Sequence, residues 1–338
     1  MLGRLSIFTG FILLIFALLT PLVVSASEAP AGSEVNPIQV PNPASDLWRE
    51  VRQRDQLTTD GTTQVKGVDT AILINPMGEE WRQFRMLQLV PIGGYVLLGI
   101  LALIVLFYLV RGNIKVSTGL SAKKLLRYTL SERSIHWFMA AVFIILGLTG
   151  LIILFGRSTL IPAMGNEIFS PLASFSKVSH DLIGPLFALA IILMFLKFVS
   201  RNIYAKGDLM WLLKGGGIIG KAHPRAGYFN MGEKTMFWVV IIGGLAVSVS
   251  GFVLLFANFG QGREVMELSH LVHGIGVIVL IGMIFGHIYI AVGMQGSLEG
   301  MTTGYCDLNW AKEHHCDWAE SAESEAISNE EVEKMRGG

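Results

Sequence analysis

Four histidines lie at the ends of long apolar stretches of this 338-residue chain: His136, His180, His273 and His287. An ionisable side chain is costly to bury in lipid and usually marks a function. His273 and His287 are 14 residues apart on one apolar run, so they lie roughly 21 Å apart along a helix that rises about 1.5 Å per residue. Neutral imidazole is a strong axial ligand for haem iron. One helix therefore offers iron ligands at two depths of a membrane.

The other two histidines complete two pairs at matched depths. His180 opens its apolar run on the same side of the membrane as His273, and His136 opens its run on the same side as His287. Two pairs of imidazoles on different helices are the arrangement that two stacked b haems need. His270, one turn before His273, is an alternative ligand. We favour His273 because its spacing to His287 fits a helix that serves two haems.

Small residues accompany these ligands. Glycines at a membrane helix interface let a neighbouring helix approach closely. A flat macrocycle needs the same kind of space. The glycines near the histidines are Gly147, Gly184, Gly274 and Gly276. Plain helix packing and cofactor contact explain each of them equally well.

Composition places the chain among integral membrane proteins. It is 52% hydrophobic and 15% charged, with a mean hydropathy of +0.54. The net charge of +0 argues against a nucleic-acid partner. The two cysteines, Cys306 and Cys316, are too few to bind an iron–sulfur cluster, so any such cluster must lie on another subunit. No Cys-x-x-Cys-His sequence occurs, which excludes covalent haem attachment of the c type.

Hydropathy predicts an all-α membrane protein. Each of five apolar runs reaches about the 20 residues that a spanning helix requires. The runs cover residues 91–110, 135–156, 178–199, 236–257 and 269–293. We expect the last four to form a transmembrane four-helix haem-binding bundle within residues 125–295. The run 91–110 is then one extra N-terminal spanning helix.

The N-terminus has the features of a secretory signal. Arg4 precedes an apolar stretch from Ile7 to Val24, and small residues lead to a cleavage site after Ala26. We expect residues 1–26 to be a signal peptide, with an uncleaved first spanning helix as the alternative.

Charge bias orients the helices. Lys and Arg concentrate in cytoplasmic loops, and the loops 111–133 and 200–234 carry six each, whereas the opposite loops carry two and one. We therefore expect the segment 27–90 to be periplasmic and the tail 296–338 to be cytoplasmic. This orientation places the His180 and His273 pair near the periplasmic face.

Polar histidines and cysteines outside the apolar runs receive a plainer interpretation. His223 is expected to be a solvated loop residue. Cys306, Cys316 and the adjacent His314 and His315 match no common zinc spacing. We expect a solvated tail whose acidic end, from Glu320 onward, is disordered.

Several motifs resemble the cytochrome b, or gamma, subunit of respiratory formate dehydrogenases, a family related to the cytochrome b subunits of membrane-bound nickel–iron hydrogenases. The resemblance covers roughly residues 125–318. Its motifs are Ser134-Ile135-His136-Trp137, Ser179-His180-Asp181-Leu182-Ile183-Gly184, Tyr228-Phe229-Asn230-Met231-Gly232-Glu233-Lys234, Met236-Phe237-Trp238, His273-Gly274, His287-Ile288-Tyr289 and Trp310-Ala311-Lys312-Glu313-His314-His315. The helix at 91–110 and the segment before it depart from the shortest members.

The resemblance implies roles for particular residues. It implies two haem b groups, one held by His136 and His287 and one by His180 and His273, together with a quinone pocket at Asn230 and Gly232. Without the family, Asn230 is equally well explained as a helix cap. Implied partners are membrane lipid, quinone, an iron–sulfur subunit and a molybdenum or tungsten catalytic subunit.

These implications describe an electron-transfer subunit in a bacterial inner membrane. Electrons would pass from the periplasmic partners through both haems to quinone near the cytoplasmic face, and formate would be oxidised on another chain. A hydrogenase counterpart is the nearest alternative. A proton-coupled transporter would need broken helices or inverted repeats, which the sequence lacks. A fourth possibility is a haem-free membrane anchor, which a measurement of haem content would distinguish from the cytochrome.

Overall fold

A computed structural model describes residues 76–214, 216 and 224–337. The predicted signal peptide, residues 27–75 of the predicted periplasmic segment and His223 lie outside the described residues. The described residues belong to two units, which divide between Gly94 and Tyr95.

The first unit contributes the start of a long helical run. Helix α3 (Pro76–Gln83) continues into the π-helical turn η2 (Phe84–Leu89) and then into α4 (Val90–Arg111). Helix α4 agrees with the predicted helix at 91–110, but helical structure begins earlier, at Pro76. A proline is well tolerated in the first turn of a helix, where its missing N–H has no partner to lose.

Four helices of the described chain are long and apolar enough to span a membrane. They are the run that contains α4, then α5 (Leu130–Phe198), α7 (Met231–Leu255) and α8 (Arg263–Gly293). Together they cover the five predicted apolar runs to within two residues, because α5 holds two of the runs. The chain is a multi-pass, helical membrane protein, as the sequence predicted.

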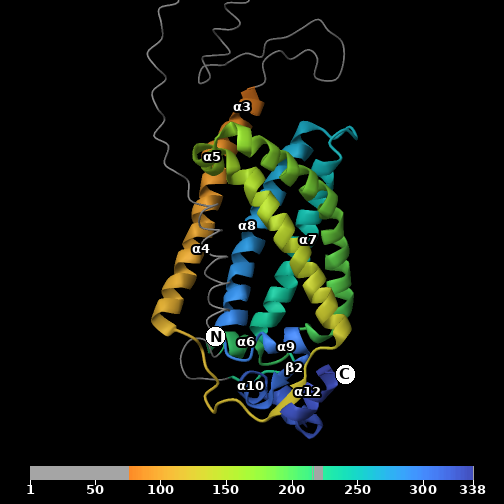
Figure 1. Cartoon of the computed structure of the whole chain (residues 1–338). Coiled ribbons are helices and arrows are strands. Elements are labelled where there is room, and N and C mark those ends of the chain that lie inside the picture. The colour runs from red at the N-terminus through yellow and green to blue at the C-terminus, as the bar shows by residue number, and fades with distance from the viewer. Residues whose placement is uncertain (1–75, 215, 217–223, 338) are drawn as a thin grey trace, which may run out of the picture. The chain divides into compact units, whose positions relative to one another are not determined.

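Helix α5 differs from the prediction in its connection. The apolar runs predict a loop at 157–177, whereas the structure has helix there, broken at Gly165. Gly165 has φ +78°, a left-handed conformation that glycine adopts without the steric cost of a Cβ. A straight helix of 69 residues would be about 100 Å long. The break instead makes two arms, 130–164 and 166–198, and the second returns along the bundle (Figure 1).

Capping boxes fix where two of the helices begin. Thr129 and Glu132 bond reciprocally at the start of α5, and Asn230 and Glu233 do the same at the start of α7. Each box satisfies backbone N–H groups that the first helical turn leaves unpaired. Both helices accordingly begin about five residues before their apolar runs.

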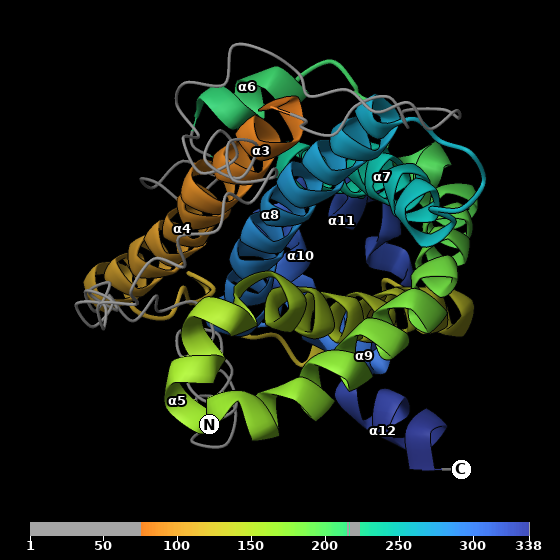
Figure 2. The ribbon, with the colours of Figure 1, turned by 90° about the horizontal axis from the view of Figure 1, so that it is seen from above.

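The core of the bundle lies between α5 and α7, and α7 also packs along α8. Figure 2 shows α7 and α8 adjacent, with α5 folded around them. The buried cluster comprises Tyr128, Met139, Val142, Phe187, Ala190, Ile191, Phe198, Phe229, Phe237 and Ile241. Helix α4 contacts α8 where Gly282 has no side chain, since a Cβ there would lie 2.6 Å from Ile100.

The tail corrects our expectation of a solvated, disordered end. It folds into α9 (Glu299–Thr303), β2 (Tyr305–Asp307), α10 (Leu308–His314), α11 (Cys316–Ala322), η5 (Glu323–Glu325), β3 (Ile327–Ser328) and α12 (Asn329–Gly337). With β1 (Lys123–Leu126), the strands form an antiparallel sheet in the order β2-β1-β3. We call residues 296–337 the C-terminal segment.

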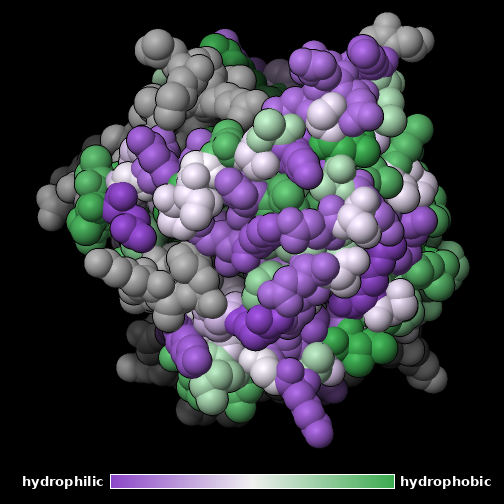
Figure 3. Space-filling view, turned by 90° about the horizontal axis from the view of Figure 1, so that it is seen from below, coloured by the Kyte–Doolittle hydropathy of each residue, from purple (hydrophilic) through white to green (hydrophobic). Residues whose placement is uncertain are grey.

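This segment has its own buried core. Leu125 of β1 contacts a cluster that includes Cys306, Trp310 and Ala311, each at most 4% exposed. Sequence reasoning missed it because each element is too short to show a periodic apolar pattern. The outer surface at this end is largely hydrophilic (Figure 3). Two short helices, η3 (Val199–Arg201) and α6 (Asp208–Leu213), lie between α5 and α7 along the chain.

Candidate functional site

The first pair of predicted ligands lies across the bundle. His180, on the second arm of α5, faces His273 on α8, and the two ring centres are 6.2 Å apart. Both side chains line a cavity of about 90 Å³. Among the described histidines, His180 and His273 line this cavity, whereas His270 does not.

Hydrogen bonds fix the orientation of both rings. The Nδ1 atom of His180 lies 2.9 Å from Thr149 Oγ1, and that hydroxyl donates its hydrogen to the Ile145 carbonyl oxygen at 2.8 Å. Thr149 therefore accepts from His180. His273 Nδ1 lies 3.0 Å from the Val247 carbonyl oxygen, which can only accept. Each Nδ1 thus carries the proton, and each Nε2 is left free to bind a metal.

Glycines shape the space around these rings. A Cβ on Gly150 would lie 3.2 Å from His180 Cε1, and a Cβ on Gly251 would lie 3.1 Å from His273 Cε1. Both glycines therefore let an imidazole lie directly against the opposite helix. Gly147 and Gly184 also line the cavity, and a Cβ at either would meet no atom within 4 Å. That open volume suits a large flat ligand.

One of the other glycines has a packing role. A Cβ on Gly276 would lie 2.6 Å from Val247 Cγ2, so this glycine lets α8 approach α7 closely. The structure therefore assigns Gly276 to helix packing.

The second pair of predicted ligands lies toward the C-terminal segment. His136, on the first arm of α5, faces His287 on α8, with ring centres 6.1 Å apart. The Nδ1 atom of His136 is buried and has no hydrogen-bond partner among the described residues. The structure thus brings all four predicted histidines into the two predicted pairs, and α8 contributes one member of each.

The predicted quinone residues lie at the start of α7. Asn230 is the N-cap: its Oδ1 accepts from Glu233 N at 3.0 Å, and its own N–H donates to Glu233 Oε2 at 2.9 Å. Gly232 lies against Trp211, whose ring would be 3.1 Å from a Cβ. The cap role foreseen for Asn230 is present, and its quinone role stays a prediction.

Comparison with known proteins identifies the family. Residues 127–304, which include all four histidines, match the family model described as prokaryotic cytochrome b561. The chain belongs to the prokaryotic cytochrome b561 family. This cytochrome is 30% identical over 219 residues to the cytochrome b556(Fdn) subunit of the nitrate-inducible formate dehydrogenase of Escherichia coli K12. The match covers 62% of this chain and 99% of the relative.

Two further relatives have similar names. The cytochrome b556(fdo) subunit of formate dehydrogenase from E. coli K12 is 28% identical over 57% of this chain and 91% of its own length. The cytochrome b556 subunit of formate dehydrogenase from Haemophilus influenzae is 27% identical over 58% of this chain and 82% of its own length. The family is one of b-type cytochromes, so haem b is the implied cofactor.

The paired histidines fit that cofactor. A ligating imidazole nitrogen lies about 2 Å from its metal and about 1 Å from its own ring centre, so two imidazoles on opposite sides of one iron have ring centres about 6 Å apart. The observed separations of 6.2 Å and 6.1 Å both agree with this requirement. The free Nε2 atoms of His180 and His273, and the open space beside Gly147 and Gly184, support the same conclusion.

Beneath the start of α7 lies a buried charged cluster that sequence reasoning missed. The side chain of Arg127 is 2% exposed. Its Nη2 donates to Glu233 Oε1 at 3.1 Å and lies 3.2 Å from His315 Nε2. The guanidinium carbon lies within 5.8 Å of five aromatic ring centres, those of Tyr128, Tyr228, Phe229, Trp310 and Trp318.

The protonation states within this cluster follow from its burial and charges. Burial lowers the pKa of Arg127, but the surrounding Tyr128, Glu233, Cys306 and Tyr228 together raise it by more, so the guanidinium stays charged. Burial and then the charge of Arg127 hold the pKa of His315 well below 6.5. A neutral His315 accepts from Arg127 through Nε2 and donates from Nδ1 to the Gly227 carbonyl oxygen at 3.1 Å.

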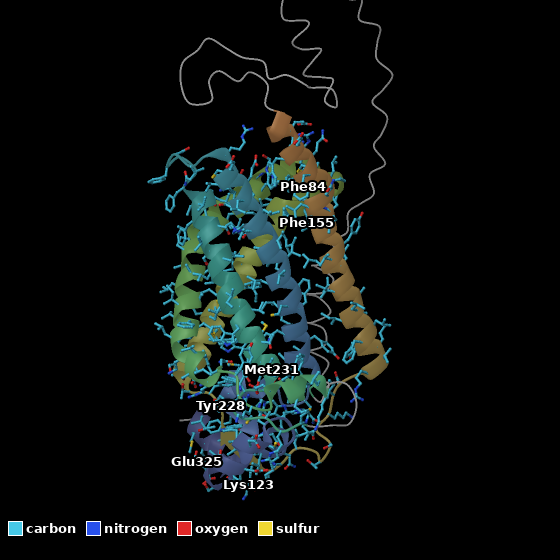
Figure 4. The ribbon with its side chains drawn as sticks, turned by 180° about the vertical axis from the view of Figure 1, so that it is seen from behind. Phe84, Lys123, Phe155, Tyr228, Met231 and Glu325 are labelled. Atoms are coloured by element: carbon cyan, nitrogen blue, oxygen red, sulfur yellow. The ribbon has the colours of Figure 1, made fainter. Side chains whose placement is uncertain are left out.

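The cluster joins the C-terminal segment to the loop that precedes α7. Tyr228, in that loop, donates a hydrogen bond to the Arg127 carbonyl oxygen, and Asp317 N donates to the Ala226 carbonyl oxygen at 3.1 Å. Figure 4 shows Tyr228 close to Met231, the first residue of α7, at this end of the bundle. The C-terminal segment therefore positions the loop that carries Asn230. The Asn230-x-x-Glu233 capping box was the sequence signal that could have drawn attention to Glu233.

Proposed function

We propose that this chain is the membrane cytochrome b subunit of a formate dehydrogenase. In this role it carries electrons from an iron–sulfur subunit on the periplasmic side of a bacterial inner membrane to quinone near the cytoplasmic face. The observation that carries the proposal is the pair of facing histidine couples that share α8. The formate dehydrogenase relative that is matched over 99% of its length supports the choice of complex.

The proposed cofactors are two haem b groups. His180 and His273 would hold one, and His136 and His287 would hold the other. Bound haem supplies reversible one-electron transfer. The chain contributes the ligands, fixes the tautomers of His180 and His273 through Thr149 and Val247, and surrounds the first couple with apolar side chains.

The proposed orientation rests on charge. The loops 111–133 and 200–234 carry six Lys and Arg residues each, which supports a cytoplasmic position for them and for residues 296–338. The His136 and His287 couple then lies near the cytoplasmic face. We propose residues 1–26 as a signal peptide and residues 27–90 as the periplasmic part, with residues 125–295 as the dihaem bundle.

The identity of the electron donor distinguishes a formate dehydrogenase subunit from a hydrogenase subunit. Moving each electron against the membrane potential costs about 2.3 kcal/mol per 100 mV, so the donor must be strongly reducing, as formate and hydrogen both are. The names of the three relatives favour formate. A catalytic partner that contains molybdenum or tungsten is proposed from the resemblance of the sequence motifs to the formate dehydrogenase family. The donor can be identified by adding formate or hydrogen to native membranes and recording the absorbance of the reduced b-type haem. Reduction by formate in the wild type, lost on deletion of this chain, is expected, and reduction by hydrogen alone would favour the hydrogenase.

Asn230 provides a test of the proposed quinone pocket. An Asn230→Ser variant keeps a side chain that caps α7 but lacks the amide. We expect it to retain both haems and to reduce quinone roughly tenfold more slowly, the value of about one hydrogen bond. The measurement is quinol formation in the purified complex.

Thr129→Ser is the matched control, because Thr129 holds the equivalent position in the capping box of α5. It should leave quinone reduction unchanged. Unchanged kinetics in Asn230→Ser, with both haems present, would remove Asn230 from the quinone pocket.

A further inference from the structure

The two histidine couples differ in what their Nδ1 atoms contact. In the first couple, His180 Nδ1 donates to Thr149 Oγ1 and His273 Nδ1 donates to the Val247 carbonyl oxygen. Ser250 Oγ lies 3.4 Å from the same His273 atom. In the second couple, the buried Nδ1 of His136 has no partner among the described residues.

This difference matters for electron affinity. When the Nδ1–H of a ligating imidazole donates to an oxygen, the ring becomes more basic and gives more electron density to its metal. The oxidised, more positive iron is then stabilised relative to the reduced iron, so the reduction potential falls. A ring whose Nδ1–H has no acceptor gives less electron density and supports a higher potential.

We propose that Thr149 and the Val247 carbonyl group set the site of His180 and His273 to a lower reduction potential than the site of His136 and His287. This inference rests on the proposed function, because it presumes that each couple holds a haem. With haem bound, each site would take up one electron, reducing ferric to ferrous iron, and would pass that electron to the next acceptor as its iron returned to the ferric state. One-electron transfer from the first couple to the second is then downhill.

Thr149 is a positioning residue in this scheme, and a conservative substitution tests it. Thr149→Val keeps the β-branched shape and removes the acceptor for His180. We expect a roughly tenfold shift toward the reduced form at the first site, a rise of about 59 mV for one electron. Thr149→Ser keeps the hydroxyl and should restore the wild-type potential. The potential of the other site should not move.

Thr159→Val is the matched control. Thr159 is also buried on α5, and its Oγ1 donates to the Phe155 carbonyl oxygen at 2.9 Å, as Thr149 does to Ile145. Thr159 makes no hydrogen bond to a histidine within the described part of the chain. Its replacement should leave both potentials unchanged, so a shift confined to Thr149→Val reports the contact with His180.

The measurement is a spectroelectrochemical titration of the purified complex. Single-haem variants, His287→Ala and His273→Ala, assign each potential to its couple. The inference predicts that the first couple has the lower potential in the wild type. Reversed or equal potentials would overturn it, as would a Thr149→Val protein with unchanged potentials.

If Thr149→Val fails to retain its haem, the order of the two reduction potentials in the wild type still tests the proposal. A failure of the proposed function has a different signature. A complex without two haems would refute the dihaem assignment itself, whereas two haems with reversed potentials refute only this inference.

Discussion

Replacing His273 by alanine is expected to remove one of two haems and to leave the other in place. His273 supplies half of the first couple, 6.2 Å from His180, and alanine has no atom that can ligate iron. The second couple uses a different part of α8, 14 residues further along. The haem-to-protein ratio of the purified variant should therefore fall to about half of the wild-type ratio.

His270→Ala is the matched control, because it makes the same change one helical turn away. His270 does not line the cavity shared by His180 and His273, so its variant should keep both haems. The opposite pattern, with both haems in His273→Ala and one in His270→Ala, would show that His270 is the ligand. A second spectroscopic sign is expected in His273→Ala, namely loss of the lower-potential component.

Replacing Arg127 by alanine is expected to destabilise the C-terminal segment strongly. The change removes the charge that contacts Glu233 and His315 and the planar group packed among five aromatic rings. Removal of one partner from a buried ion pair costs about 3–5 kcal/mol. Because the Glu233 side chain is 35% exposed, we expect about 3 kcal/mol, the lower end of that range. Tryptophan fluorescence during denaturation measures it, since Trp310 and Trp318 lie in the cluster.

Arg225→Ala is the control, because it removes a positive charge from the same region without disturbing the buried cluster. Arg225 pairs with Asp317 and Glu320, but its side chain is 64% exposed. Exposed ion pairs contribute little because water screens them. The Arg225 variant should therefore unfold at nearly the wild-type denaturant concentration. An Arg127 variant as stable as the Arg225 variant would contradict the role assigned to the cluster.

Much of the fold was predictable from hydropathy, since a spanning helix must be about 20 residues long and apolar. The connection at 157–177 was not. The apolar runs stop at 156 and resume at 178, with Arg157 and Lys177 between them, which predicts a loop. The structure instead continues α5 through these residues, with a break at Gly165. The C-terminal segment was also missed. Its stability comes from contacts with β1 and the loop before α7, which no local pattern of residues records.

The histidine pairs were predictable because spacing along a helix encodes depth in a membrane. Their hydrogen-bond partners were not. Thr149 is 31 residues from His180, and Val247 is 26 residues from His273, so these contacts depend on how the helices pack. The Arg127 contacts span 106 residues to Glu233 and 188 residues to His315. Such partners appear only once the chain is folded.

The proposed function requires the four histidines to hold two b haems. The haem content of the purified chain, determined by the pyridine haemochrome and a reduced-minus-oxidised spectrum, tests this requirement. We predict two b haems per chain, reduced to about one in each single-histidine variant. A chain that contains no haem, although it was produced with haem available, would contradict the dihaem assignment and would favour a haem-free anchor or a transporter.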